Sequence, residues 1–123
     1  MQNFGIGVDI ESVSRFKKEG LDINSLFLNK IFTKDELEFC FSKKNYAQHL
    51  AARFAGKEAV IKALGSMGKE VADYYAIEIL NNEKGVPMVK IISPNISDVE
   101  VYISLSHCKD KALSFVTVKE HKK

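Results

Sequence analysis

The chain has 123 residues, enough for one compact domain, and its 46% hydrophobic and 28% charged residues are ordinary for a globular protein. These values exclude a disordered, collagen-like or low-complexity chain. The 18 basic and 16 acidic residues give a formal charge of +2, which by itself does not argue for nucleic acid. No apolar run approaches the ~18 residues that span a membrane. We therefore expect residues 1–123 to form a single soluble, cytoplasmic domain with neither nucleic acid nor membrane as a partner.

The first predicted element is a strand. Residues Phe4 to Ile10 form a short apolar run with two glycines, which predicts a buried strand ending at Asp9, and a mixed helical pattern follows from Glu11 to Lys18. If the backbone stays extended, Asp9 and Glu11 point the same way, because strand side chains alternate. Two such carboxylates suit a hard cation such as Mg²⁺. The alternative is that Asp9 caps the next helix and Glu11 stabilises its first turn.

Two further helices are predicted in the first half of the chain. The sequence Thr33-Lys34-Asp35-Glu36 is a capping box, which predicts a helix running to about Phe41. After Asn45, hydrophobic residues at helical spacing predict a long helix that ends at Leu64, with Gly65 as the stop signal.

The long helix carries an aromatic, an acidic and a basic residue on one face. Phe54, Glu58 and Lys62 are each four residues apart, so they share a side of the helix. One interpretation is an ordinary surface ion pair between Glu58 and Lys62. The functional interpretation is that Glu58 binds a metal ion while Lys62 binds a phosphate.

The second half of the chain shows the alternation of apolar and polar residues that is typical of strands. Four strands are predicted, over residues 75–80, 86–92, 99–105 and 112–118, and Asn82-Glu83-Lys84-Gly85 predicts a hairpin turn with Gly85 at positive φ. The predicted fold class is therefore α+β, with helices packed on an antiparallel sheet.

One histidine and two cysteines are the remaining reactive side chains of interest. His107 follows the alternating serines Ser104 and Ser106, so it can bind a phosphate or transfer protons, or it can simply be exposed at a strand end. Cys40 and Cys108 form no CxxC pair, and we expect two free thiols.

Four motifs occur in order along nearly the whole chain, and the lysine–glutamate motif of the long helix is the most specific of them. The motifs are Gly5-Ile6-Gly7-Val8-Asp9-Ile10, Arg53-Phe54-Ala55-x-Lys57-Glu58-Ala59-x-x-Lys62-Ala63-x-Gly65, Gly85-Val86-Pro87 and Ser104-Leu105-Ser106-His107. In identity, order and spacing they resemble the motifs of the holo-acyl-carrier-protein synthases, the small branch of the 4′-phosphopantetheinyl transferases.

The resemblance implies the 4′-phosphopantetheinyl transferase fold and an enzyme of fatty acid biosynthesis. The implied reaction is Mg²⁺-dependent transfer of phosphopantetheine from coenzyme A to a serine of apo acyl carrier protein, with release of adenosine 3′,5′-bisphosphate. Asp9 and Glu58 would bind Mg²⁺, Glu58 would take the serine proton, and Lys62 would steady the pyrophosphate.

The resemblance also implies where coenzyme A and the carrier protein bind. The family is typically trimeric, so Asp9, Glu58 and Lys62 of one chain would face His107 and its serines, including Ser106, from the next. Gly65 would lie near the pantetheine arm, the Gly85–Pro87 turn beside adenine, and Lys44, Arg53 and His107 near the 3′-phosphate. We expect the acidic carrier protein to contact four residues after the first strand: Arg15, Lys17 and Lys18 by charge, and Phe16 on its apolar ridge.

The chain departs from the family pattern at Glu11. Small synthases usually have a non-acidic residue there and a glutamate where this chain has Ser12. An acid at the position of Glu11 is typical of the two-lobed branch of the superfamily, where it joins the metal shell. We therefore expect Glu11 to reach Mg²⁺ through a water molecule. The alternative function is a non-catalytic coenzyme A- or nucleotide-binding protein, which would leave the carrier protein unmodified.

Overall fold

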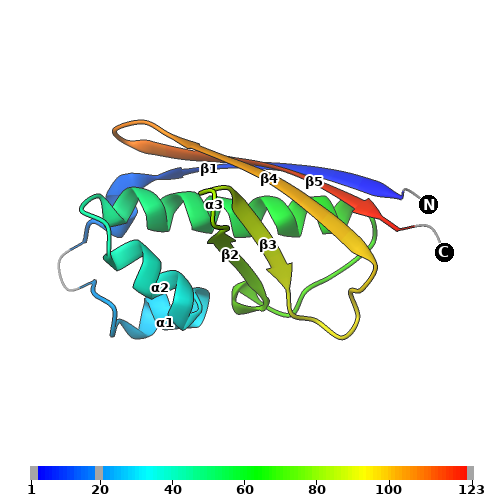
Figure 1. Cartoon of the computed structure of the whole chain (residues 1–123), viewed down its shortest axis with the longest axis horizontal. Coiled ribbons are helices and arrows are strands. Elements are labelled where there is room, and N and C mark those ends of the chain that lie inside the picture. Colours follow the sequence, from blue (N-terminus) through cyan, green and yellow to red (C-terminus); the bar gives the residue numbers. More distant parts are fainter. Residues whose placement is uncertain (1–2, 19–20, 122–123) are drawn as a thin grey trace.

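The computed structural model describes residues 3–18 and 21–121 (Figure 1). The strands are β1 (Phe4–Ser12), β2 (Ile77–Asn81), β3 (Pro87–Ile91), β4 (Val99–His107) and β5 (Lys111–Glu120), and the helices are α1 (Leu26–Ile31), α2 (Lys34–Phe41) and α3 (Tyr46–Ser66). Two 3-10 turns, η1 (Val13–Phe16) and η2 (Tyr74–Ala76), complete the chain. All strand pairs are antiparallel, in a three-stranded sheet of order β1-β5-β4 and a two-stranded sheet β2-β3. The predicted α+β class is confirmed.

The long helix α3 lies at the centre of the molecule. Figure 1 shows it along one face of the three-stranded sheet, with α1, α2 and the β2-β3 hairpin on the side away from that sheet. One part of the hydrophobic core joins the first half of α3 to η1, α1 and α2, and the other joins its second half to both sheets. Both cysteines are free thiols, as predicted. Among the described residues, no helix combines the length and apolar character required to cross a membrane.

Two glycines allow the backbones of β1 and α3 to touch. A Cβ atom on Gly5 would lie 2.2 Å from the carbonyl oxygen of Ala63, and one on Gly7 would lie 1.9 Å from that of Ala59. Both contacted atoms belong to the helix backbone and cannot turn aside. The glycines of the first motif therefore set the spacing between strand and helix, and Asp9 follows directly on this closely packed strand.

We expect Gly7→Ala to lower the free energy of unfolding by about 1–3 kcal/mol or more, because the added methyl group must push α3 away from β1. Gly65→Ala is the matched control, since a Cβ at Gly65 meets no atom within 4 Å. Alanine is favoured over glycine inside a helix, so this control should be neutral or slightly stabilising. Urea unfolding measures both variants, and an unchanged midpoint for Gly7→Ala would contradict the close packing.

Several predicted boundaries are confirmed and others are wrong. The capping box of α2 is complete, because Thr33 Oγ1 accepts from the Glu36 N–H while the Glu36 carboxylate accepts from the Thr33 N–H. Gly85 has positive φ (81°), as predicted. The predicted helix from 11 to 18 is wrong, because β1 pairs with β5 as far as Ser12 and only the short turn η1 follows. The long helix does not stop before Gly65, and the residue at positive φ beyond its end is Gly68 (75°).

Candidate active site

The carboxylates of Asp9 and Glu11 lie on the same side of β1. The strand remains extended to Ser12, so both residues share the helix-facing side with the two glycines, while Val8 and Ile10 face outward. The alternative in which Asp9 caps a helix and Glu11 opens it is wrong, because η1 begins only at Val13.

Lys62 on α3 joins this strand. Its Nζ donates to Asp9 Oδ1 at 3.1 Å and to the carbonyl oxygen of Val8 at 3.0 Å. The ion pair of Lys62 is thus with Asp9 across the strand–helix contact, and not the helical pair with Glu58 that the spacing allows. The other oxygen of Asp9, Oδ2, is buried and accepts no hydrogen bond. A buried carboxylate oxygen without a donor is unusual in proteins, and a divalent cation is a ligand that would satisfy it.

Glu11 is held between Asp9 and Arg15. Burial, followed by the nearby carboxylate of Asp9, raises the pKa of Glu11 to about 7, and Glu58 acts in the same direction. Arg15 Nη1 lies 3.3 Å from Glu11 Oε1 and lowers this pKa. Near neutral pH, burial and the neighbouring carboxylates therefore leave Glu11 partly protonated, and a cation placed beside it would favour its charged form.

Glu58 is half-buried on α3 and interacts with Tyr74 of η2. The nearby carboxylate of Glu58, followed by burial, raises the pKa of Tyr74 to about 12. Among the described residues, no three His, Cys, Asp or Glu side chains converge closely enough to hold a metal ion by themselves. Asp9 and Glu58 fit Mg²⁺ as a site of few protein ligands, since this ion usually keeps several waters and binds through one or two carboxylates.

Four residues that the family resemblance assigned to coenzyme A meet in one hollow. The hollow has a volume of about 250 Å³ and lies between α3, the β2-β3 turn and the end of β4. The four are Arg53, Gly85, Pro87 and His107, and the hollow is also lined by His49, Ala52, Asn81 and Leu105.

Arg53 is the fixed cation of this hollow. Only 2% of it is exposed, and its guanidinium donates to the carbonyl oxygen of Ile79 at 3.1 Å and to Asn81 Oδ1 at 3.2 Å. The same group lies over the ring of Phe39, 4.4 Å from its centre. Since a guanidinium has five N–H donors, these contacts orient the charge and leave donors for an anion.

His49 is a lining residue that the sequence analysis missed. Its ring centre is 6.2 Å from that of His107 and 5.6 Å from that of Phe39. Burial, with the charges of Arg53, His107 and Lys43, lowers the pKa of His49, so the ring is mainly neutral at pH 7. The available signal was its position four residues before Arg53 on the same face of α3.

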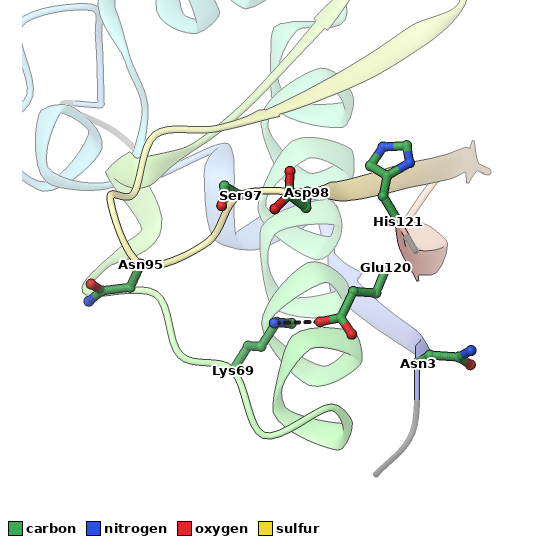
Figure 2. A pocket seen from close by; sticks show the side chains of 7 residues that line it. All are labelled: Asn3, Lys69, Asn95, Ser97, Asp98, Glu120 and His121. Carbon is green, nitrogen blue, oxygen red and sulfur yellow. Dashed lines mark ion pairs between the residues drawn. The ribbon is translucent and has the colours of Figure 1, made fainter. Parts of the chain in front are cut away.

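The remaining predicted residues are distributed over other surfaces. Lys17 and Lys44 line a hollow of about 420 Å³ at the start of α3, and Gly65 lines one of about 480 Å³ near the end of that helix. Ser106 is exposed on β4. A further hollow of about 510 Å³, around the Lys69–Glu120 ion pair, contains none of the residues predicted from sequence (Figure 2).

The prediction that Phe16 meets a partner is wrong. Its ring is fully buried between those of Phe32 and Phe54, because η1 directs it into the core. Lys17 and Lys18 are exposed beside it. Exposed apolar side chains follow later in the chain on α1, where Leu26 is 81% exposed and Phe27 is also exposed.

Comparison with known proteins connects these features to one family. A model described as the 4′-phosphopantetheinyl transferase superfamily matches residues 5–116. The chain is 46% identical over 114 residues to a holo-[acyl-carrier-protein] synthase from Thermodesulfovibrio yellowstonii, covering 93% of this chain and 96% of that protein. It is 41% identical over 115 residues to the synthase from Protochlamydia amoebophila, with 90% and 93% covered.

Solved structures with the same fold include complexes with coenzyme A. A Chronobacterium ammoniagenes ACPS–CoA complex has a TM-score of 0.80 and 25% identity, covering 98% of this chain and all of that one. A Bacillus anthracis holo-(acyl-carrier-protein) synthase in complex with CoA (3′,5′-ADP) has a TM-score of 0.76 and 28% identity, with 94% and 96% covered.

Proposed function

The chain belongs to the 4′-phosphopantetheinyl transferase superfamily, and we propose that it transfers 4′-phosphopantetheine from coenzyme A to a serine of apo acyl carrier protein. The products are the holo carrier protein and adenosine 3′,5′-bisphosphate, and the proposed setting is fatty acid biosynthesis in the cytoplasm. The observation that carries the proposal is the contact between Lys62 and Asp9, which places a phosphate-binding cation beside a carboxylate whose second oxygen is buried and unpartnered.

Asp9 and Glu58 are the residues that would hold Mg²⁺, with Glu11 reaching it through a water molecule. The unpartnered Asp9 Oδ2 and the electrostatic proximity of the three acids support this assignment. When bound, Mg²⁺ supplies positive charge that neutralises the pyrophosphate of coenzyme A.

The chain's own residues then carry the chemistry. Glu58 accepts the proton of the carrier serine, whose oxygen attacks the phosphorus that bears the pantetheine arm. The bond from this phosphorus to the bridging oxygen breaks, and the bridging oxygen leaves with adenosine 3′,5′-bisphosphate. Lys62 exchanges its contact with Asp9 for the pyrophosphate and steadies the charge on the leaving phosphate.

The hollow around Arg53 supports a site for the adenosine 3′-phosphate. Arg53 and His107 supply donors, and the Gly85–Pro87 turn provides an open edge where adenine can lie. His49 adds a ring beside His107. Lys44 and Gly65, which line other hollows of the chain, remain proposed contacts of coenzyme A.

The outer face of the three-stranded sheet supports a homotrimer. Figure 1 shows the helices and the hairpin on one side of this sheet and its other side uncovered. A contiguous apolar face of this kind is typical of an interface between protein chains. We propose that a neighbouring chain covers it, so that Asp9, Glu58 and Lys62 act with Ser106 and His107 of that neighbour. The exposed apolar side chains are Phe4, Ile6, Val8, Ile10, Tyr102, Leu113 and Phe115.

The acidic carrier protein is proposed to bind beside η1 and α1. Lys17 and Lys18 are exposed, and Arg15 is partly occupied by its ion pair with Glu11. Because Phe16 is buried, we assign the apolar part of the contact to Leu26 and Phe27 on α1.

Charge reversal at Lys17 and Lys18 is expected to raise the KM for the carrier protein several-fold and to leave the KM for coenzyme A unchanged. The contact is between exposed charges, and added salt should reproduce the effect because the Debye length is only ~8 Å at physiological ionic strength. Charge reversal at Lys90, exposed on β3, is the control. An unchanged KM for the carrier protein would remove Lys17 and Lys18 from the interface.

The proposed reaction is tested by the release of adenosine 3′,5′-bisphosphate, measured by chromatography. Release should require coenzyme A, apo carrier protein and Mg²⁺ together, and it should stop when any one of them is omitted. A non-catalytic coenzyme A-binding protein would retain the ligand without releasing this product.

A further inference from the structure

Arg53 is a buried cation whose direct partners among the described residues are all neutral. Its guanidinium contacts the carbonyl oxygen of Ile79, the amide oxygen of Asn81 and the ring of Phe39. The ion pairs found within the described part of the chain do not include it. Buried charges in proteins are normally paired, so a guanidinium without a carboxylate partner beside a hollow marks a place for an anion.

The guanidinium is bound along one edge and open along another. Nε donates to the carbonyl oxygen of Ile79 at 3.1 Å and Nη2 donates to Oδ1 of Asn81 at 3.2 Å, and these two nitrogens share one edge of the planar group. The next edge, formed by Nη1 and the second hydrogen of Nη2, donates to none of the described residues. Two parallel N–H donors of this kind match two oxygens of a phosphate.

Asn81 stands on a strand that both long-range neighbours of Arg53 hold in place. It is the last residue of β2, which pairs with β3 along its other edge. Two residues earlier, Ile79 donates its N–H to Glu36 Oε2 at 2.8 Å and accepts from Arg53. Lys57 pairs with the same carboxylate, with 2.8 Å between Nζ and Oε1. The position of Asn81 relative to Arg53 is therefore fixed by side chains of α2 and α3.

The partner of Arg53 on β2 is a neutral amide and not a carboxylate. An amide oxygen accepts one N–H and fixes the direction of the guanidinium without cancelling its charge. An aspartate at the same position would form an ion pair with Arg53 and repel a phosphate in the hollow. Asn81 and Arg53 both line that hollow. The arrangement thus keeps a full positive charge at a fixed orientation beside it.

We propose that Asn81 is a positioning residue for Arg53, and that the pair makes the chain selective for coenzyme A over the same molecule without its 3′-phosphate. This role rests on the proposed function, in which Arg53 binds the 3′-phosphate. A site built to bind a polar group rejects the analogue that lacks it, because the buried partner is then left unpaired. Asn81 lies outside the four sequence motifs, so its role depends on the contact that the fold creates.

Two substitutions at Asn81 and one control test this role. Asn81→Ala removes the amide, and Asn81→Asp keeps the size of the side chain while adding a charge. Asn81 is exposed at the end of its strand, so both variants are expected to fold. Asn95→Ala is the matched control, because Asn95 is an exposed asparagine in the separate hollow around Lys69 and Glu120 (Figure 2).

We expect Asn81→Ala to raise the KM for coenzyme A about tenfold, the effect of losing one hydrogen bond to a charged group. The kcat, and the KM for coenzyme A without its 3′-phosphate, should stay unchanged. Asn81→Asp should raise the KM for coenzyme A further, although its ion pair with Arg53 should preserve or raise the urea unfolding midpoint. A merely structural role would not separate the two substrates in this way. Asn95→Ala should match the wild type with both.

Calorimetry with adenosine 3′,5′-bisphosphate and with adenosine 5′-monophosphate measures the same selectivity without any transfer. If the wild type prefers the bisphosphate and Asn81→Asp loses that preference, the positioning role is supported, and a carrier protein that stays unmodified would then count against the transfer reaction alone. Variants at Asn81 that keep the preference, or that lose affinity for both nucleotides equally, would overturn the role of Asn81. A wild type that transfers phosphopantetheine without any preference for the 3′-phosphate would also overturn it.

Discussion

Glu58→Gln is expected to lower the rate of phosphopantetheine transfer by about 10²–10⁴-fold, the usual range for loss of a general base. The amide keeps the size of the side chain but can neither accept the serine proton nor bind a cation as a carboxylate does. Asp9→Asn is expected to cause a comparable loss, because it removes the charge that faces Lys62. Initial rates at saturating coenzyme A and Mg²⁺ measure both effects. Glu38→Gln, the same substitution at an exposed residue of α2, should leave the rate unchanged.

A site shared between neighbouring chains predicts that two inactive variants restore part of each other's activity. If the acids of one chain act with His107 of its neighbour, inactive Glu58→Gln chains and inactive His107→Ala chains should regain part of the activity when they are refolded together. Some interfaces between chains in the mixed trimers would then contain both native residues, Glu58 and His107. An active monomer in light scattering, or no recovery in the mixture, would contradict a site shared between chains.

Lys57→Met is expected to lower the free energy of unfolding by about 3–5 kcal/mol, because it leaves the charge of Glu36 buried without a partner. Both side chains are fully buried, and Lys57 Nζ lies 2.8 Å from Glu36 Oε1. Lys57 also donates to the carbonyl oxygens of Tyr74 and Ile77. Glu36 accepts in turn from the backbone N–H groups of Thr33 and Ile79. The pair therefore connects α2, α3 and β2 at one point.

Urea unfolding of three variants tests this role of the buried pair. Lys69→Met is the control, since the Lys69–Glu120 pair has a similar N–O distance of 2.8 Å but is partly exposed. Pairs near the surface contribute only about 0–1 kcal/mol. The double variant Glu36→Leu with Lys57→Met should be more stable than Lys57→Met alone, because no buried charge remains unpaired. Equal losses for Lys57→Met and Lys69→Met would contradict the account of the buried pair.

Much of the fold could be predicted from local sequence patterns. Alternation of apolar and polar residues places β2 and β4 within a few residues, turn signals place β3 and β5 equally well, and the capping box fixes the start of α2. The end of β1 could not be predicted, because pairing with β5 holds Glu11 and Ser12 extended against a helical pattern. The helix α1 was missed because its six residues are too few for a periodic signal, and its cap, Ser25, is a common loop residue.

The motif residues of the candidate site were proposed from sequence, and the residues that contact them in the fold were not. Asp9, Glu58 and Lys62 stand in motifs that resemble a known family. In the sequence, Lys57 is one of several positive charges on the long helix and gives no sign of burial. Only the packing of α3 on several sides shows that its side chain is buried. Phe16 was assigned to the surface because charged residues flank it in the sequence, and only the fold shows that it is buried. Such contacts depend on which distant segments meet, and local periodicity does not contain that information.

The intact mass of an apo acyl carrier protein decides whether this chain is a transferase. After incubation with the purified chain, coenzyme A and Mg²⁺, the carrier protein should gain the mass of one phosphopantetheine group. A carrier variant with alanine in place of the acceptor serine should keep its mass, as should the native carrier incubated with Glu58→Gln. An unchanged mass of the native carrier, with a wild-type chain that binds coenzyme A, would contradict the transfer reaction and identify a coenzyme A-binding protein instead.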